Sequence, residues 1–367
     1  MIISAISNYR FTAPFKVQNN NKNNSYSSEP LKMASPLAKD TVSFTATAKN
    51  LESRALGVSL DTARKVFKEA EPMQKKIQEF MQNTFGDLVA TDMNPHNLIY
   101  AMHNRTKKPI SIMEKSATRQ LNSKAEILTF MTDLNGAKIV MRDGRRKYVD
   151  RVLERLLEPI RSGQIELVEI ENKRPIAVKN LKGAAKKEQY DYPSMNMLTE
   201  LVEAEENKWL DKNGKKKHLI KFDPNDYTEM NYCATHFLLK FPEEERPFEL
   251  MLMGYDVSLL KDLDDKLFKI LNNKNAGKEY LPLTKIVKPL LEPGNAPLLE
   301  KFNKYRGEAF LFQREKEPNA VVLKNQPVYL LPMRYALPPE LDLNNLYKVY
   351  TQCKEVEAKN LAKKAKP

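Results

Sequence analysis

The chain has 367 residues, of which 41% are hydrophobic and 29% are charged. At roughly 100–200 residues per domain, this length indicates about two domains or one domain with additions, and the apolar content excludes a wholly disordered chain. The 60 Lys and Arg exceed the 47 Asp and Glu, which leaves a formal net charge of +13. That charge favours an anionic partner such as a nucleotide, a nucleic acid or an acidic surface, although a lysine-rich surface alone also produces it.

Cysteine content and apolar runs exclude further classes. Cys233 and Cys353 are too few for a disulfide framework or an all-cysteine zinc site. No run approaches the roughly 18 apolar residues of a membrane span. The first residues, MIISAISNYRF, lack the basic and long apolar regions of a secretory signal. We therefore expect a soluble, cytoplasmic protein with no membrane partner.

Residues 1–50 are predicted to be a disordered N-terminal arm. Their segment VQNNNKNNSYSSEP is polar and without periodicity, so it buries too little apolar surface to offset its ordering entropy. A helix follows from Ser59 or Asp61, either of which can cap it, because apolar residues recur at helical spacing as far as Met81.

The following segments alternate between strand and helix patterns up to residue 170. Pro109 suits the first turn of a helix, and GAKIVMR is typical of a buried strand. The predicted order is a strand or turn at 97–102, a helix at 109–119, a strand at 136–142, an amphipathic helix at 146–160 and a strand at 165–170.

Residues 172–217 are rich in Lys and Glu, and we expect a mostly helical surface insertion there, without a strand. After it come two strands at 234–241 and 248–254, joined by a PEEER turn, and a helix at 256–272. Residues 276–367 are predicted to be a helical C-terminal extension. The fold class is therefore α+β, with a mixed sheet flanked by helices, and residues 51–275 form the main domain.

A cationic motif spans the predicted junction at 105–115. Arg105 and Lys107 are two residues apart and point to one side if the segment is extended. Ser111 and Lys115 are four apart and share one face of a helix. Cations that converge at a helix N-terminus attract phosphate groups. The alternative is a solvated basic helix, which the spacing alone does not exclude.

Two carboxylates accompany predicted strands. Asp133 lies at the entrance to GAKIVMR, and Glu249 lies in PFELMLMG. Carboxylates on neighbouring strands are suitable Mg²⁺ ligands in phosphoryl transfer. The alternatives are a turn residue for Asp133 and an outward-facing strand position for Glu249. Tyr232 and His236 precede the strand FLLKF, where a tyrosine can stack on a base and a histidine can bind a phosphate or hydroxyl, or both can be core residues.

Taken in chain order, these pieces resemble the synthetase domain of the RelA/SpoT-type (p)ppGpp synthetases. The shared order is Arg-x-Lys-x3-Ser-x3-Lys from 105, Asp-Leu-x-Gly from 133, Tyr-x3-His from 232 and Pro-x-Glu from 247. The resemblance covers residues 60–275, interrupted by the 172–217 insertion. It implies a nucleotidyltransferase-like fold and a Mg²⁺-dependent GTP pyrophosphokinase of the stringent response, which moves pyrophosphate from ATP to the 3′-hydroxyl of GDP or GTP.

The resemblance also implies a role for each motif residue. Asp133 and Glu249 would hold Mg²⁺, and Glu249 would assist the attack of the 3′-hydroxyl. Tyr232 would stack on the guanine of the acceptor, and His236 is the histidine that follows it. The ATP-binding residues would be Arg105, Lys107, Ser111 and Lys115.

The acceptor motifs depart from the family pattern. Gly-Tyr-Arg-Ser-Leu-His reads Asn-Tyr-Cys-Ala-Thr-His at 231–236, Glu-x-Gln-x-Arg-Thr reads Glu-Leu-Met-Leu-Met-Gly at 249–254, and the strand arginine is Lys138. Guanine specificity is thus less supported than ATP binding. Two alternatives stay open: pyrophosphorylation of the 3′ end of tRNA, or a decayed domain that only senses nucleotide. The hydrolase domain of the long family members is not expected, and the oligomeric state is open.

Overall fold

A computed structural model of the chain describes residues 57–94, 97–142, 146–176, 194–223, 226–228, 231–274, 276–315 and 336–364. The chain divides into two units, Met1–Ser53 and Arg54–Pro367. The predicted disordered arm at 1–50 lies outside the described residues, so all that follows concerns the second unit. Within its described part, no helix is both long and apolar enough to cross a bilayer.

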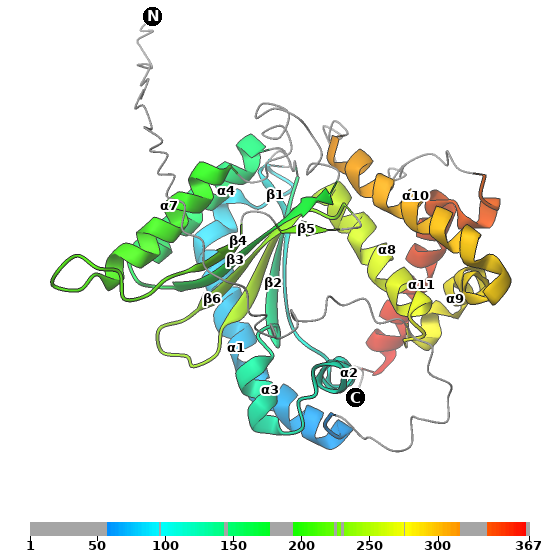
Figure 1. Cartoon of the computed structure of the whole chain (residues 1–367), viewed down its shortest axis with the longest axis horizontal. Helices are drawn as coiled ribbons and strands as arrows, with labels where there is room; N and C mark the ends of the chain where they lie inside the picture. Colours follow the sequence, from blue (N-terminus) through cyan, green and yellow to red (C-terminus); the bar gives the residue numbers. More distant parts are fainter. Residues whose placement is uncertain are drawn as a thin grey trace, which may run out of the picture. The chain divides into compact units, whose positions relative to one another are not determined.

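The described helices and strands alternate along the second unit (Figure 1). The helices are α1 (Leu60–Phe85), α2 (Pro109–Arg119), α3 (Lys124–Phe130), α4 (Arg146–Arg161), α7 (Met195–Glu206), α8 (Tyr255–Leu271), α9 (Leu281–Val287), α10 (Ala296–Glu315) and α11 (Leu343–Lys364). The strands are β1 (Ile99–Thr106), β2 (Asn135–Met141), β3 (Glu166–Pro175), β4 (Lys221–Asp223), β5 (Tyr227–Thr228), β6 (Ala234–Lys240) and β7 (Phe248–Gly254). Short 3-10 turns connect several of them, among them η3 (Asn207–Trp209), η5 (Lys288–Leu291) and η7 (Pro339–Leu341).

Local sequence signals explain where several helices begin. The Ser59 hydroxyl accepts a hydrogen bond from the Thr62 amide, so Ser59, one of the two predicted candidates, caps α1, and Asp61 lies in its first turn. Pro109 is in the first turn of α2, as expected. Ser123 and Glu126 form a capping box at the start of α3. The Ser123 hydroxyl accepts from the Glu126 backbone N–H, and the Glu126 carboxylate accepts from the Ser123 backbone N–H.

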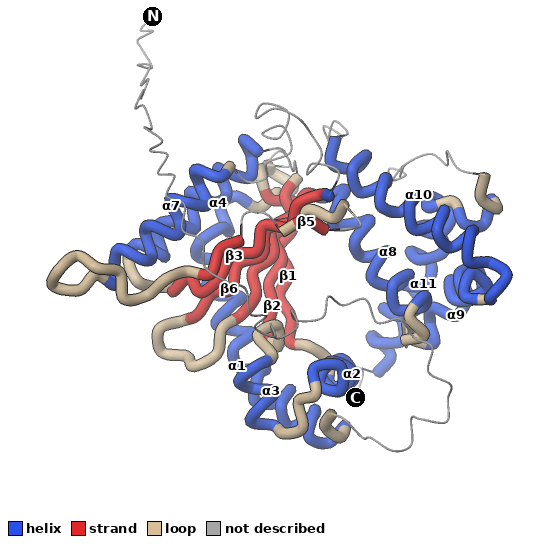
Figure 2. The backbone as a smooth tube through the Cα atoms, in the orientation of Figure 1, coloured by secondary structure: helices blue, strands red, loops and turns tan. Residues whose placement is uncertain are grey.

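The strands form one mixed sheet in the order β1-β2-β7-β6-β3-β4, with β5 paired to β3. The β2–β7 and β3–β4 pairs are parallel, whereas β1–β2, β7–β6 and β6–β3 are antiparallel. Figure 2 shows helices beside the sheet. The predicted α+β class with a mixed, helix-flanked sheet is therefore confirmed.

The two faces of the sheet differ in character. On one face, side chains such as Ile139, Leu250 and Phe237 pack against α1, α4 and α7 in the largest apolar cluster. Each fully buried side chain of this size contributes about 2 kcal/mol of transfer free energy. The opposite face carries polar residues in two cross-strand rows, which are His103–Lys138–Met251–His236–Glu171 and Arg105–Gly136–Glu249–Leu238–Glu169. Residues opposite one another in register share a face, so these rows lie side by side.

Two smaller apolar clusters complete the unit. One joins the N-terminal half of α1 to α2 and α3 around Ile112 and Ile127. The other joins α8 to α9, α10 and α11 around Tyr280, Phe302 and Tyr305. Because α8 belongs to this second cluster, the expected boundary between residues 275 and 276 falls within one apolar core. The division into a main domain and an extension stays a prediction.

The expected surface insertion at 172–217 is wrong in two places. Strand β3 continues to Pro175, and Asn172 and Arg174 are buried in it. Helix α7 buries Leu198 and Leu201 in the cluster under the sheet. The charged composition of this segment gave no sign of these elements. Composition does not distinguish a polar side chain that is buried with a partner from one that is exposed to water.

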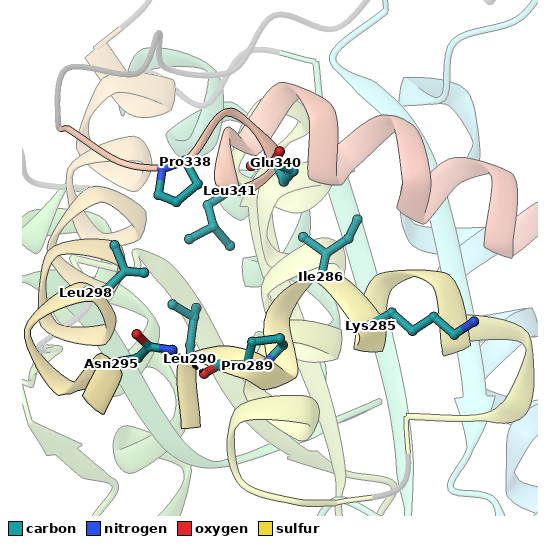
Figure 3. Close-up of a pocket in the computed structure, with 9 residues that line it drawn as sticks. All are labelled: Lys285, Ile286, Pro289, Leu290, Asn295, Leu298, Pro338, Glu340 and Leu341. Atoms are coloured by element: carbon teal, nitrogen blue, oxygen red, sulfur yellow. Dashed lines mark hydrogen bonds between the residues drawn. The ribbon is translucent and has the colours of Figure 1, made fainter. Parts of the chain in front are cut away.

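A pocket of about 340 Å³ lies among the C-terminal helices (Figure 3). Leu290, Leu298 and Leu341 form its apolar lining, and in the figure the amine of Lys285 points away from it. None of the predicted site residues lines it. A polyphosphate needs several converging cations, so this pocket is not a candidate nucleotide site.

A buried ion pair holds α10 to α8. Arg306 Nε donates to Asp264 Oδ1 at 2.8 Å, and both side chains are largely buried. Arg306→Ala leaves the aspartate without its partner and should lower the free energy of unfolding by about 3 kcal/mol in urea denaturation. Lys301→Ala, an exposed position on the same helix, should change it by less than about 0.5 kcal/mol. Equal effects would show that the pair does not stabilise the helices.

Candidate active site

The candidate site begins where β1 passes into α2. Lys107 lies between these elements, and its backbone N–H donates to the Leu134 carbonyl at 2.7 Å, which ties the junction to the segment before β2. Arg105 is an exposed residue of β1 and lies opposite Gly136 on the polar face. In the described structure no side chain caps the N-terminus of α2. Its first N–H groups therefore stay available to a ligand.

Asp133 is the centre of the cationic side of this site. Its Oδ2 atom accepts from Lys107 Nζ and from Lys115 Nζ, each at 2.6 Å. All three side chains are at least partly buried. The structure thus brings together Lys107, Lys115 and Asp133, which lie on three different parts of the chain. Ser111, which is half-buried, lies one turn before Lys115 on α2.

The charges of this cluster depend on one another. Burial alone would raise the pKa of Asp133, but the attraction and hydrogen bonds of the two lysines lower it to about 2. Burial lowers the pKa of Lys107, against the attraction of Asp133, and the neighbouring Lys115 and Arg105 lower it further. The carboxylate is therefore ionised near neutral pH, and its single negative charge offsets one of the three neighbouring positive charges.

One oxygen of Asp133 has no protein partner. Its Oδ1 atom is buried and makes no hydrogen bond, and such atoms usually have a ligand or water in the functional state. Among the described residues, no group of three or more His, Cys, Asp or Glu side chains can hold a metal ion. Mg²⁺ is commonly held by one or two carboxylates together with substrate phosphates. The residues present therefore fit a Mg²⁺ that arrives with a nucleotide.

Glu249 lies on β7, directly beside β2. It is in register with Gly136, which is in turn opposite Arg105. Glycine leaves the position between Arg105 and Glu249 without a side chain, so this row of the sheet is open at its centre. Asp133 precedes the same glycine by three residues, and its charge acts on Glu249. Of the two predicted metal-binding carboxylates, Glu249 thus lies on β7 and Asp133 in the turn that leads into the adjacent strand β2, at the same end of the sheet.

A hydrogen-bonded chain runs from Glu249 across the neighbouring strand. Glu249 Oε1 lies 2.9 Å from His236 Nδ1, and His236 Nε2 lies 3.2 Å from the Tyr232 hydroxyl. Burial would raise the pKa of Glu249, but the hydrogen bond and charge of His236 lower it. The two predicted acceptor-binding residues, Tyr232 and His236, therefore meet each other and the predicted catalytic residue Glu249.

Tyr232 is covered by helices that the sequence motifs did not implicate. Its ring meets Phe310 of α10 edge-to-face at a centroid distance of 5.8 Å, and Lys261 Nζ of α8 lies 5.5 Å from its centroid. Its hydroxyl also contacts Met251 Sδ at 3.7 Å. Tyr232 thus packs against the C-terminal apolar cluster. No spacing signal in the sequence relates Lys261 or Phe310 to this tyrosine.

Lys138 is also tied to the C-terminal helices. Its Nζ donates to Ser258 Oγ and Asp262 Oδ1 of α8, each at 3.1 Å. This lysine of β2 is therefore held by α8.

Comparison with known proteins gives matches among solved structures only. No family model matches the chain, and no curated protein matches its sequence. The small alarmone synthetase 1 of Bacillus subtilis, bound to its product pppGpp, aligns over 68% of this chain and 95% of its own, at 14% identity and a TM-score of 0.32. Small alarmone synthetase 2 of Bacillus subtilis aligns over 66% and 98%, at 16% identity and a TM-score of 0.34.

A GTP pyrophosphokinase family protein of Streptococcus pneumoniae aligns over 71% of this chain and 96% of its own, at 12% identity and a TM-score of 0.32. What we propose for this chain rests on its own residues and their geometry.

The Asp133 cluster predicts an acid-dependent contribution to stability. The pKa of Asp133 lies below its ordinary value of 3.8 in the folded chain, at about 2, so its stabilising effect is complete above pH 4 and is lost as the pH falls towards 2. The shift corresponds to about 2 kcal/mol. Urea unfolding of the native chain and of Asp133→Asn should therefore differ most at pH 5 and converge near pH 2. A pH-independent difference would contradict the lowered pKa.

Proposed function

We propose that this chain is a Mg²⁺-dependent pyrophosphokinase that transfers pyrophosphate from ATP to the 3′-hydroxyl of GDP or GTP. The observation that carries the proposal is the meeting of Asp133 with Lys107 and Lys115 at the end of the sheet where Glu249 lies on the adjacent strand. This arrangement places cations, a carboxylate oxygen without a partner and a second carboxylate around one open row of the polar face.

The donor side would bind the ATP phosphates. Arg105, Lys107 and Lys115 supply three positive charges, and the N-terminus of α2 adds its free N–H groups. Ser111 would lie against the same phosphates. Since Lys107 and Lys115 already converge on one oxygen, they are positioned before the nucleotide arrives, which reduces the entropy lost on binding.

The carboxylates would hold the metal and accept the proton. Asp133 Oδ1 and Glu249 are the residues that would hold Mg²⁺, which neutralises phosphate charge when bound. The ionised Glu249 would take the proton of the acceptor 3′-hydroxyl as that oxygen bonds to the β-phosphorus of ATP. The bond from the β-phosphorus to the α,β-bridging oxygen breaks, and AMP leaves with the electron pair.

The packing around Tyr232 favours a second candidate for the acceptor. A tyrosine that stacks on guanine needs free space beside its ring, whereas Phe310 and Lys261 pack close to the ring of Tyr232. The same donor chemistry with a different acceptor, such as the 3′ end of tRNA, is the alternative. A chain that binds ATP and transfers nothing is the other, in which case the domain only senses nucleotide.

The proposed activity is tested with purified full chain, Mg²⁺ and ATP labelled in the β-phosphate, offered with GDP, GTP or tRNA in separate reactions. We expect labelled guanosine 3′-pyrophosphate with GDP or GTP. Asp133→Asn and Glu249→Gln should each lower turnover at least about 100-fold, because each removes charge that acts on the transferring group. Glu166→Gln, which alters a β3 carboxylate paired with Lys240, is the matched control.

Label in tRNA alone would identify the second acceptor. ATP binding without product from any acceptor would support the sensor and contradict the proposed reaction. Native activity in either carboxylate variant would contradict the assigned role of that residue.

Arg105 should act on donor binding. Arg105→Ala removes one exposed positive charge from the ATP side, so we expect the KM for ATP to rise about tenfold with little change in the KM for the acceptor. Arg64→Ala removes an equal charge from an exposed site on α1 and should leave both constants unchanged. If the two variants behave alike, Arg105 is a residue of a solvated basic surface.

A further inference from the structure

A basic hairpin, residues 207–221, projects between α7 and β4, at the left edge of Figure 1. It contains six lysines (208, 212, 215, 216, 217 and 221) and one acidic residue, Asp211, so its formal charge is six minus one, or +5. It takes no part in the candidate active site. Its charge alone indicates an anionic partner. Its conformation and its exposed side chains indicate which kind of anionic partner it fits.

The hairpin has a defined conformation. The Asp211 backbone N–H donates to the Lys215 carbonyl at 2.8 Å, and the Lys217 N–H donates to the Trp209 carbonyl at 2.8 Å. Gly214 provides the left-handed turn at φ +74°. Glu206 anchors the base by accepting from the Ile220 N–H at 2.9 Å and from Lys216 Nζ at 2.8 Å. The tip is therefore presented in a preformed geometry.

Large apolar side chains are exposed on this hairpin. Trp209 is 43% exposed, Leu210 45% and Leu219 70%. The indole of Trp209 donates through Nε1 to Glu205 at 3.0 Å, so its polar atom has a partner while much of its ring contacts water. Three such side chains within one short hairpin differ from the single exposed apolar residues that are normal on a surface.

The lysines of the hairpin form two groups. Lys208, Lys216 and Lys221 pair with Glu205, Glu206 and Glu169. Lys212, Lys215 and Lys217 are exposed and form no ion pair with any residue in the described ranges. The second group therefore carries charge that no described carboxylate offsets.

We propose that the basic hairpin binds the surface of an anionic lipid bilayer. Leu210, Leu219 and Trp209 enter the interface, and the free lysines contact headgroup phosphates. RNA would also satisfy the lysines and could stack on the tryptophan, but it offers no hydrocarbon in which to bury two leucines. The expectation of no membrane partner came from the lack of a spanning run, and a hairpin that lies at the surface needs no such run.

The chain carries a built-in probe of this proposal. Trp209 is the only tryptophan in the sequence, so intrinsic tryptophan fluorescence reports on the hairpin alone. Full chain is mixed with vesicles of phosphatidylcholine, with or without phosphatidylglycerol. We expect a blue shift of the emission, quenching by brominated acyl chains and co-sedimentation with the anionic vesicles only, and we expect salt to weaken all three.

Variants separate the two parts of the surface. The triple change Lys212→Gln, Lys215→Gln and Lys217→Gln should weaken partitioning by about 100-fold, since each lysine near an anionic surface contributes about fivefold. The matched control Lys65→Gln, Lys68→Gln and Lys75→Gln changes the same charge on α1 and should have little effect. Leu219→Ser should weaken partitioning by about tenfold, whereas Leu281→Ser, at a residue of α9 that is 54% exposed, should not.

Three results would overturn the proposal. One is an unchanged emission with anionic vesicles. Another is an equal loss of vesicle partitioning in the two triple-lysine variants, which would show that only the net charge of the chain matters. The third is quenching by a single-stranded RNA oligonucleotide without any response to vesicles, which would assign the hairpin to nucleic acid. None of these readouts depends on the pyrophosphokinase reaction, so each proposal can be contradicted without affecting the other.

Discussion

The salt bridges of Asp133 to Lys107 and Lys115 hold the candidate site together. They join the residue that follows β1, the middle of α2 and the turn that precedes β2. A partly buried carboxylate is tolerated there because two cations contact it, and the lysines keep their positions because the carboxylate attracts both. Repulsion between the lysines would otherwise favour their separation. The same contact leaves Oδ1 without a partner, so stability and ligand binding use different oxygens of one side chain.

The sheet turns this local cluster into a larger surface. Because β2 and β7 are parallel neighbours, the segment that follows Asp133 lies next to the strand of Glu249. Gly136 separates Arg105 from Glu249 in the same row. A larger residue at 136 would place a side chain between the cations and the second carboxylate. The polar face can carry such groups because α1, α4 and α7 bury the apolar face and supply most of the core under the sheet.

Local sequence patterns allowed much of the fold to be predicted. Contacts between segments that are distant in sequence could not be predicted from such patterns. The cap of α1, the proline of α2 and the β6–β7 hairpin all depend on residues near in sequence. The same holds for the spacing of Lys107, Ser111 and Lys115. The end of β3 was missed because Asn172 and Arg174 are polar yet buried. The covering of Tyr232 by Phe310 was missed because no periodicity connects a strand entrance with a distant helix.

This difference between near and distant contacts also separates the two sides of the site. The proposed donor side lies within one continuous segment, residues 105–136, which runs from β1 through α2 and α3 into β2. The proposed acceptor side combines β6 and β7 with α8 and α10, which are distant from them in sequence or follow them. Lys138 of β2 pairs with Asp262 of α8. Met251 of β7 contacts Tyr232, whose ring packs against α8 and α10. Under the proposed function, an acceptor that contacts Tyr232 does so beside Lys261 and Phe310, so these side chains, as much as Tyr232, would decide which acceptor fits.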